Sequence, residues 1–169
     1  EQFRRFTGVC RLEGLGAGLN VLAAPNEAGK STMLAALRAL FFCRATSSTQ
    51  LTKSFEPYGG GAPRVRAEFT VDGENYVFEK QFLKRQFTRL SADGRQIEGD
   101  EANAHIHRLL GLESARRGEA DGLLAALWVE QGQSFTQPAL CDTARQSVRS
   151  CLTQDFDEIT GGADAGRIL

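Results

Sequence analysis

The pattern of apolar and polar positions predicts strands at the start of the chain. Residues 3–24 predict two strands joined by a turn at Gly14–Gly18. Leu19, Val21 and Leu22 suit a buried strand, because their apolar run is short and is followed by Pro and Gly. We therefore expect a strand to lead directly into the segment that follows it.

A helix and a long loop come next. From Ser31 onward, apolar side chains recur at helical spacing, which predicts a helix over about residues 29–43. Residues 44–62 are polar and rich in Ser, Gly and Pro. They predict a loop with few apolar anchors that is long enough to be functional or mobile.

An antiparallel meander is predicted in the middle of the chain. Apolar and polar residues alternate on both sides of Asp72-Gly73, which is a strong β-hairpin signal. A third strand over about residues 87–91 turns at Asp93-Gly94. A short helix then starts near Asp100 and ends at Gly111.

The remainder of the chain predicts one more strand and one more helix. Residues 123–133 resemble a buried strand that runs into a loop, and residues 138–152 carry an apolar stripe at helical spacing. Together these elements indicate an α/β (α+β) fold of the P-loop type, with a mixed sheet and an appended antiparallel β-meander.

A phosphate-loop motif joins the predicted first helix to the strand before it. Residues 24–32 read Ala-Pro-Asn-Glu-Ala-Gly-Lys-Ser-Thr. This matches G-x-x-x-x-G-K-[ST], except that Ala24 stands in place of the first Gly. Because Ala24 precedes the amides that would cradle phosphate, the departure affects the turn geometry more than the phosphate contacts.

The residue types of this motif suit a nucleotide and a divalent cation. The unpaired N–H groups at a helix N-terminus and the positive end of the helix dipole form an anion site. Lys30 would add a positive charge for the β- and γ-phosphates, and the Ser31 hydroxyl would ligate Mg²⁺. The residues expected to contact ATP are Asn26, Glu27, Ala28, Gly29, Lys30, Ser31 and Thr32.

Composition and charge restrict the possible functions. The chain has 169 residues, a net charge of −1, 41% apolar and 24% charged residues, as in an ordinary globular domain. The near-neutral charge confines any nucleic-acid binding to a local patch. No apolar run approaches the roughly 20 residues of a membrane helix, and no signal peptide is visible. The four cysteines lack metal-ligand spacing and read as reduced thiols, so a cytoplasmic protein is expected.

One basic run has two interpretations. Residues 79–89 carry Lys80, Lys84, Arg85 and Arg89 among phenylalanines. Such a run is found in patches that bind a phosphate backbone, and also along solvated strand edges that charge protects from aggregation. Both interpretations stay open at the level of the sequence.

The order of the motifs resembles a known family of ATPases. The segments FRRF, LNVLAAPNEAGKST, PYGGGAPRVRAEFTVDGENYVFEKQF and LWVEQGQ follow one another along the chain. This order resembles the N-terminal ATPase lobe of the SbcC-like and YhaN-like repair ATPases. These coiled-coil proteins are ABC-type ATPases and are relatives of the SMC proteins, which maintain chromosome structure. The resemblance covers nearly the whole chain.

The resemblance implies an ATP site with particular residues and partners. Gln131 matches the Q-loop glutamine, which contacts Mg²⁺ and the region of the attacking water, so that Lys30 and Gln131 are the implied catalytic residues. Residues 1–152 would be the N-terminal lobe of an ATPase head, and residues 153–169 would begin the connection to a coiled coil. The implied partners are a C-terminal lobe of the same protein, a second head, DNA and a nuclease.

Two motifs that an ABC-type ATPase needs are not found in the sequence. These are an apolar strand ending in Asp-Glu, and an L-S-G-G signature. Glu130 has no Asp before it, Asp157-Glu158 has no apolar strand before it, and LSADG at residues 90–94 falls in a predicted hairpin turn. We therefore expect a half-site, whose isolated form binds Mg-nucleotide weakly and hydrolyses it negligibly.

Other functions are compatible with the phosphate loop. A free-standing P-loop kinase or GTPase is one alternative, although neither an Asn-Lys-x-Asp base reader nor an Arg-rich lid can be placed. A regulatory module that binds nucleotide without turnover is the other alternative.

Overall fold

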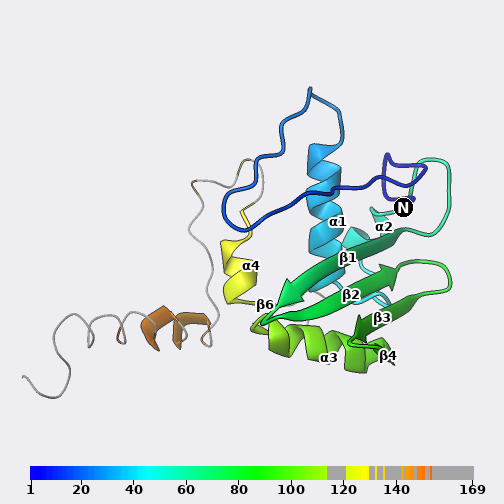
Figure 1. Ribbon diagram of the computed structural model, residues 1–169. Coiled ribbons are helices and arrows are strands. Elements are labelled where there is room, and N and C mark those ends of the chain that lie inside the picture. The colour runs from blue at the N-terminus through cyan, green and yellow to red at the C-terminus, as the bar shows by residue number, and fades with distance from the viewer. Residues whose placement is uncertain are drawn as a thin grey trace, which may run out of the picture.

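A four-stranded antiparallel sheet organises the fold (Figure 1). The computed structural model describes residues 1–113 and 121–129, together with positions 132, 135, 142, 144–146, 148–150 and 153. Neighbouring strands in the sheet follow the order of the chain, which makes it a meander. The strands are β1 (Arg64–Val71), β2 (Glu74–Gln81), β3 (Phe87–Ala92) and β4 (Arg95–Glu98).

Two tight turns set the register of this meander. Asp72 and Gly73 have φ values of 52° and 84°, and Asp93 and Gly94 have φ values of 45° and 79°. Two successive residues with positive φ form the turn that best matches the twist of a hairpin, and Asp-Gly is a preferred sequence for it. The predicted hairpins are therefore confirmed, whereas β4 after the second turn was not predicted.

Two helices cover one face of the sheet, where the apolar core lies (Figure 1). The predicted helices are confirmed as α1 (Lys30–Phe42) and α3 (Gly99–Leu109). Inward-facing residues alternate along the strands and meet the apolar stripes of both helices. The buried members of the cluster are Phe3, Ala39, Leu40, Cys43, Ala45, Phe55, Val65, Tyr76, Phe78, Phe82, Leu90, Ala102 and Ile106.

The opposite face of the sheet carries charged side chains in pairs. Arg64 pairs with Glu79 across two strands, and Arg89 pairs with Glu98 at 2.9 Å. These residues alternate along their strands with those that face the core. The sheet is thus one layer of a two-layer α/β arrangement.

The prediction of two strands at the start of the chain is wrong. Residues 7–25 form neither helix nor strand, and no described segment pairs with them as a strand. Leu19 and Val21 are 93% and 80% exposed. The Asn20 side chain instead hydrogen-bonds the backbone of Gly16 and Gly18. A strand needs a neighbouring strand for its N–H and C=O groups, and here the backbone uses a local side chain. The predicted mixed sheet is accordingly absent from the described residues.

The prediction of a strand over residues 123–133 is also wrong for the first part of this segment. A helix, α4 (Leu123–Leu127), occupies this segment after two short strands, β5 (Leu112–Glu113) and β6 (Asp121–Gly122). A short apolar run fits a buried strand or a buried helix equally well, and Leu and Ala favour the helix. The Trp128 ring packs edge-to-face on Phe42, with ring centroids 5.6 Å apart.

The long loop after α1 is fastened to the core by an aromatic side chain. It contains a short helix, α2 (Gln50–Lys53), which Thr49 caps through its side chain. Phe55 is only 2% exposed and packs on Phe3 and Phe82. The loop therefore has few apolar anchors, as expected, and Phe55 is the aromatic residue that fastens it to the core.

The helix predicted at residues 138–152 lies largely outside the described residues. Its described positions, 142, 144–146 and 148–150, are helical. None of the described helices combines the length and apolarity needed to cross a membrane.

Candidate phosphate-binding site

The loop before α1 has the backbone geometry of an anion site. Gly29, the residue before the helix, is left-handed with a φ of 95°, and Glu27 has a φ of 63°. Ala28, between them, does not have a positive φ. Alternation of this kind turns consecutive backbone N–H groups toward a common concavity, which is how backbone nests bind anions. The described backbone thus suits a phosphate ahead of the first turn of α1.

Gly29 is held closely by an aromatic side chain from the start of the chain. A Cβ atom added to Gly29 would lie 2.5 Å from Cζ of Phe6. Phe6 is itself fixed by a backbone hydrogen bond of 3.0 Å to the carbonyl of Phe3. Both the dihedral angles and the packing therefore call for glycine at this position.

The Lys30 ammonium folds back over the loop. Its Nζ donates hydrogen bonds to the carbonyl oxygens of Ala24 at 2.5 Å and Pro25 at 2.8 Å. Among the described residues, none of the ion pairs includes Lys30. A positive charge held only by carbonyl dipoles keeps most of its attraction for an added anion. Nearby Glu27 does not supply its counter-charge.

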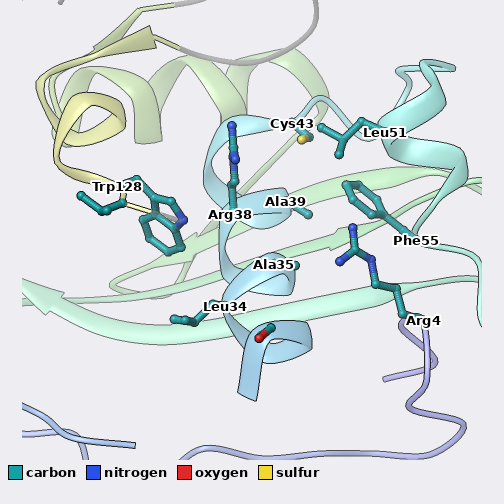
Figure 2. Close-up of a pocket in the computed structure, with 11 residues that line it drawn as sticks. Arg4, Leu34, Ala35, Arg38, Ala39, Cys43, Leu51, Phe55 and Trp128 are labelled. Atoms are coloured by element: carbon teal, nitrogen blue, oxygen red, sulfur yellow. The ribbon is translucent and has the colours of Figure 1, made fainter. Parts of the chain in front are cut away.

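A cavity of about 430 Å³ begins beside this loop and follows α1 (Figure 2). Ser31 lies at the phosphate-loop end of α1, and Arg38 lies two turns further along the helix. Figure 2 shows α1 between Trp128 on one side and Phe55 with Arg4 on the other. The lining residues are Arg4, Ser31, Leu34, Ala35, Arg38, Ala39, Cys43, Leu51, Phe55, Trp128 and Val129.

Arg4 is part of this cavity wall. Its guanidinium lies 5.9 Å from the ring centroids of both Phe3 and Phe55, and it donates a hydrogen bond of 3.2 Å to Ser54. The side chain of Arg5 is exposed. Arg4 thus lines the same cavity as Ser31, whereas Arg5 does not.

The predicted site residues have different positions relative to this loop. Asn26, Glu27 and Ala28 lie exposed in the turn, Gly29 and Lys30 start the helix, and Thr32 is half-buried in its first turn. Gln131 lies outside the described residues.

Sequence reasoning missed two features of the site. Phe6 packs on Gly29, and no local pattern links residues so far apart in the chain. Arg38 could have been found, because Ser31, Leu34, Ala35 and Arg38 share one helical face by their spacing.

The basic run at residues 79–89 does not form a single patch. Lys80 is completely buried, and Arg89 pairs with Glu98. Lys84 and Arg85 remain exposed in the loop between β2 and β3. Because the charges point to different environments, neither interpretation of the run holds for all of it.

The described residues contain no cluster of His, Cys, Asp or Glu that could bind a metal by itself. The hydroxyl of Ser31 is a hard oxygen ligand of the kind that Mg²⁺ accepts, usually together with phosphate oxygens and water. A hydroxyl at this position is compatible with a cation that is held jointly with a nucleotide.

Comparison with known proteins identifies related sequences. A protein-family model described as an AAA domain matches residues 2–156. The chain is also similar to the uncharacterized proteins Rv1278 of Mycobacterium tuberculosis (strain ATCC 25618 / H37Rv) and Mb1309 of Mycobacterium bovis. Each is 31% identical over 97 residues, which are 55% of this chain. The chain covers only 11% of the length of each relative.

Proposed function

Because the chain belongs to the AAA domain family of P-loop, nucleotide-binding ATPases, we propose that residues 24–32 bind the phosphates of ATP. The observation that carries the proposal is the loop ahead of α1. It combines alternating backbone handedness with a lysine that has only carbonyl partners in the described chain. Both features favour an anion, and the helix dipole adds to them.

Each residue of the loop has a defined task in this proposal. The amides of residues 26–32 surround the β- and γ-phosphates, and Lys30 exchanges its carbonyl partners for phosphate oxygens. Ser31 and Gln131 ligate Mg²⁺, which draws negative charge away from the phosphates when bound. Arg4 and Arg38 add positive charge along the adjoining cavity. Phosphoryl transfer depends chiefly on such positioning and charge stabilisation.

We further propose that the chain supplies one half of a composite ATPase site. The apolar residues between 9 and 22 support this, because they are strand-like in pattern but exposed and unpaired in the described structure. A second lobe of the same protein would pair with them and supply the Asp-Glu strand. The relatives offer ample length for such a lobe, since the chain covers 11% of each.

The wider role follows from the order of the sequence motifs. We propose that residues 1–152 are the N-terminal lobe of an SbcC-like, SMC-related ATPase of the ABC type, and that residues 153–169 lead toward a coiled coil. Two such heads would associate on ATP and separate after hydrolysis, while the whole protein acts on DNA in the cytoplasm, in repair or chromosome maintenance. A nuclease would be its partner.

Nucleotide binding and turnover by the purified chain test these proposals. We expect weak binding of ATP that requires Mg²⁺, and negligible release of phosphate, because half of the site is absent. GTP serves as the competitor that would reveal a GTPase. Robust turnover that Lys30→Ala abolishes would contradict the half-site, and absence of ATP binding at millimolar concentration would contradict the phosphate site itself.

A further inference from the structure

Lys80 is a completely buried lysine at the C-terminal end of α1. Its side chain projects from β2 into the core, where its exposed fraction is 0%. The Nζ atom donates a hydrogen bond of 2.7 Å to the carbonyl of Cys43, the residue that ends α1. It also lies 4.9 Å from the centroid of the Phe78 ring. A polar contact inside the core therefore joins the sheet to the phosphate-loop helix.

The groups that face Lys80 do not neutralise its charge. They are the thiol of Cys43 and the side chain of Arg44 at the end of α1, and His107 from α3. No carboxylate is among these described neighbours. Burial lowers the pKa of Lys80 from 10.5 to about 7, and burial together with Lys80 lowers the pKa of His107.

The end of α1 is what makes this position tolerable for a basic group. The last carbonyls of a helix have no partner within the helix and carry its partial negative charge. Lys80 bonds the carbonyl of Cys43, and His107 bonds the backbone of Phe41. Two basic side chains from two different elements thus hold the same helix end.

Packing does not explain a lysine at this position. An apolar residue of similar volume would fill the same space without the cost of removing an ammonium from water. The contribution specific to lysine is the directed hydrogen bond to Cys43. That bond fixes one end of α1 relative to β2.

The other end of α1 carries the phosphate loop. The helix has 13 residues, and at 1.5 Å per residue it is about 20 Å long. A rigid rod of this length transmits a rotation at one end to the other. We propose that Lys80 is a positioning residue for the nucleotide site, which it sets by holding the C-terminal end of α1 against the sheet. This inference rests on the proposed role of residues 24–32 in binding ATP.

The first test replaces Lys80 by Met, which has a similar length but neither charge nor N–H donor. Lys84→Met is the matched control, since Lys84 is exposed in the loop after β2. At about pH 6.5 we expect Lys80→Met to bind Mg-ATP about tenfold more weakly, which corresponds to about 1.4 kcal/mol. Its thermal midpoint should equal or exceed that of the wild type, because a buried charge is gone. The control should match the wild type in both respects.

The dependence on pH separates positioning from a merely structural role. As the pH rises from about 6 to 8.5, the wild type and the control should lose Mg-ATP affinity, because Lys80 loses its proton near pH 7 and its neutral amine donates a weaker hydrogen bond to Cys43. Lys80→Met should lack this component, whereas the nucleotide's own titration affects all three proteins equally. Unchanged affinity in Lys80→Met, or pH profiles of the same shape for all three, would overturn the proposal.

Hydrogen exchange without nucleotide gives a second and independent readout. The amide of Met33 bonds the carbonyl of Gly29 at 3.0 Å and reports on the first turn of α1. We expect local opening of this turn, and with it exchange of the amide, to be faster in Lys80→Met than in Lys84→Met, and faster in the wild type at pH 8.5 than at pH 6 after correction for intrinsic rates. The wild-type comparison decides the matter if Lys80→Met fails to fold, and equal rates would overturn the proposal. If the wild type binds no ATP, the proposed function fails, while these rates still decide whether Lys80 holds α1.

Discussion

Gly29 adopts a backbone conformation that only glycine enters without cost. Its φ is 95°, and an added Cβ would approach the Phe6 ring to 2.5 Å. The left-handed conformation costs other residues roughly 1–2 kcal/mol. We predict that Gly29→Ala lowers the free energy of unfolding by about this amount in urea titrations. It should also weaken Mg-ATP binding, because relief of the contact with Phe6 distorts the loop.

Gly60→Ala provides the control for this prediction. Gly60 also has a positive φ, 76°, but no atom lies within 4 Å of the position of its Cβ. The control should lose a comparable free energy of unfolding and keep the wild-type affinity for ATP. If Gly29→Ala also kept that affinity, the role assigned to the loop geometry would be wrong.

At the scale of single residues, the sequence predicts local motifs better than it predicts contacts between distant segments. Residues 24–32 could be singled out from the sequence, because glycine, lysine and hydroxyl residues occur there at fixed spacing. The packing of Phe6 on Gly29 and the burial of Lys80 could not. Both depend on segments that meet only in the folded chain, and Lys80 follows a glutamate in what reads as a charged strand.

The contact between β2 and α1 makes stability depend on pH. The pKa of Lys80 is about 7 in the folded protein against 10.5 in the unfolded chain. Between these values the unfolded chain holds a proton that the folded protein has released. The free energy of unfolding therefore rises with pH across this window, by on the order of 1 kcal/mol for each unit.

Lys80→Met should remove most of this rise, as measured by urea unfolding at several pH values between about 6 and 9.5. A smaller rise below pH 6.5 should persist, because the pKa of His107 is also lowered. The variant should be at least as stable as the wild type at about pH 6, where both states of the wild type carry the proton. If the free energy of unfolding changed with pH in the same way in both proteins, burial of the Lys80 ammonium would not be the cause of the rise.

The loop between α1 and β1 is fastened to the core by Phe55. This ring stacks on Phe3 with centroids 4.9 Å apart and meets Phe82 edge-on at 5.3 Å. Truncation of a buried phenylalanine typically costs about 3–5 kcal/mol. We predict a loss near the lower figure for Phe55→Ala in urea unfolding. Tyr58→Ala, at a residue of the same loop that is 88% exposed, should leave the free energy of unfolding nearly unchanged. Similar losses in both variants would contradict the anchoring role of Phe55.

Among the elements, those with strong local signals could be predicted and those that need distant partners could not. The meander follows from alternating residues and two Asp-Gly turns, and α1 and α3 follow from helical spacing. The strand expected around Val21 fails, because no described strand lies beside it. The strand expected before Trp128 fails because a five-residue apolar segment specifies burial rather than conformation.

At the scale of the whole molecule, a two-layer core supports a site that lies at its edge. The sheet and the helices α1 and α3 share one apolar cluster, whereas residues 7–29, which include the phosphate loop, contribute none of its buried members. Changes in the loop should therefore alter ligand binding more than folding. None of the apolar side chains of residues 7–25 is buried in this core.

Substitution of Lys30 tests the central claim most directly. Its ammonium bonds only carbonyl groups in the described chain, so Lys30→Ala removes little that stabilises the fold. Lys53→Ala, at an exposed lysine at the end of α2, is the matched control. Thermal unfolding without ligand and titration with Mg-ATP are measured for the wild type and both variants.

The account predicts nearly equal thermal midpoints for all three proteins. It also predicts that the Mg-ATP affinity of Lys30→Ala falls by about 1.5–3 kcal/mol, the scale of a lost hydrogen bond to a charged group. Lys53→Ala should bind as the wild type does. A clear loss of thermal stability in Lys30→Ala, with unchanged affinity for Mg-ATP, would show that Lys30 is structural and would contradict the phosphate site.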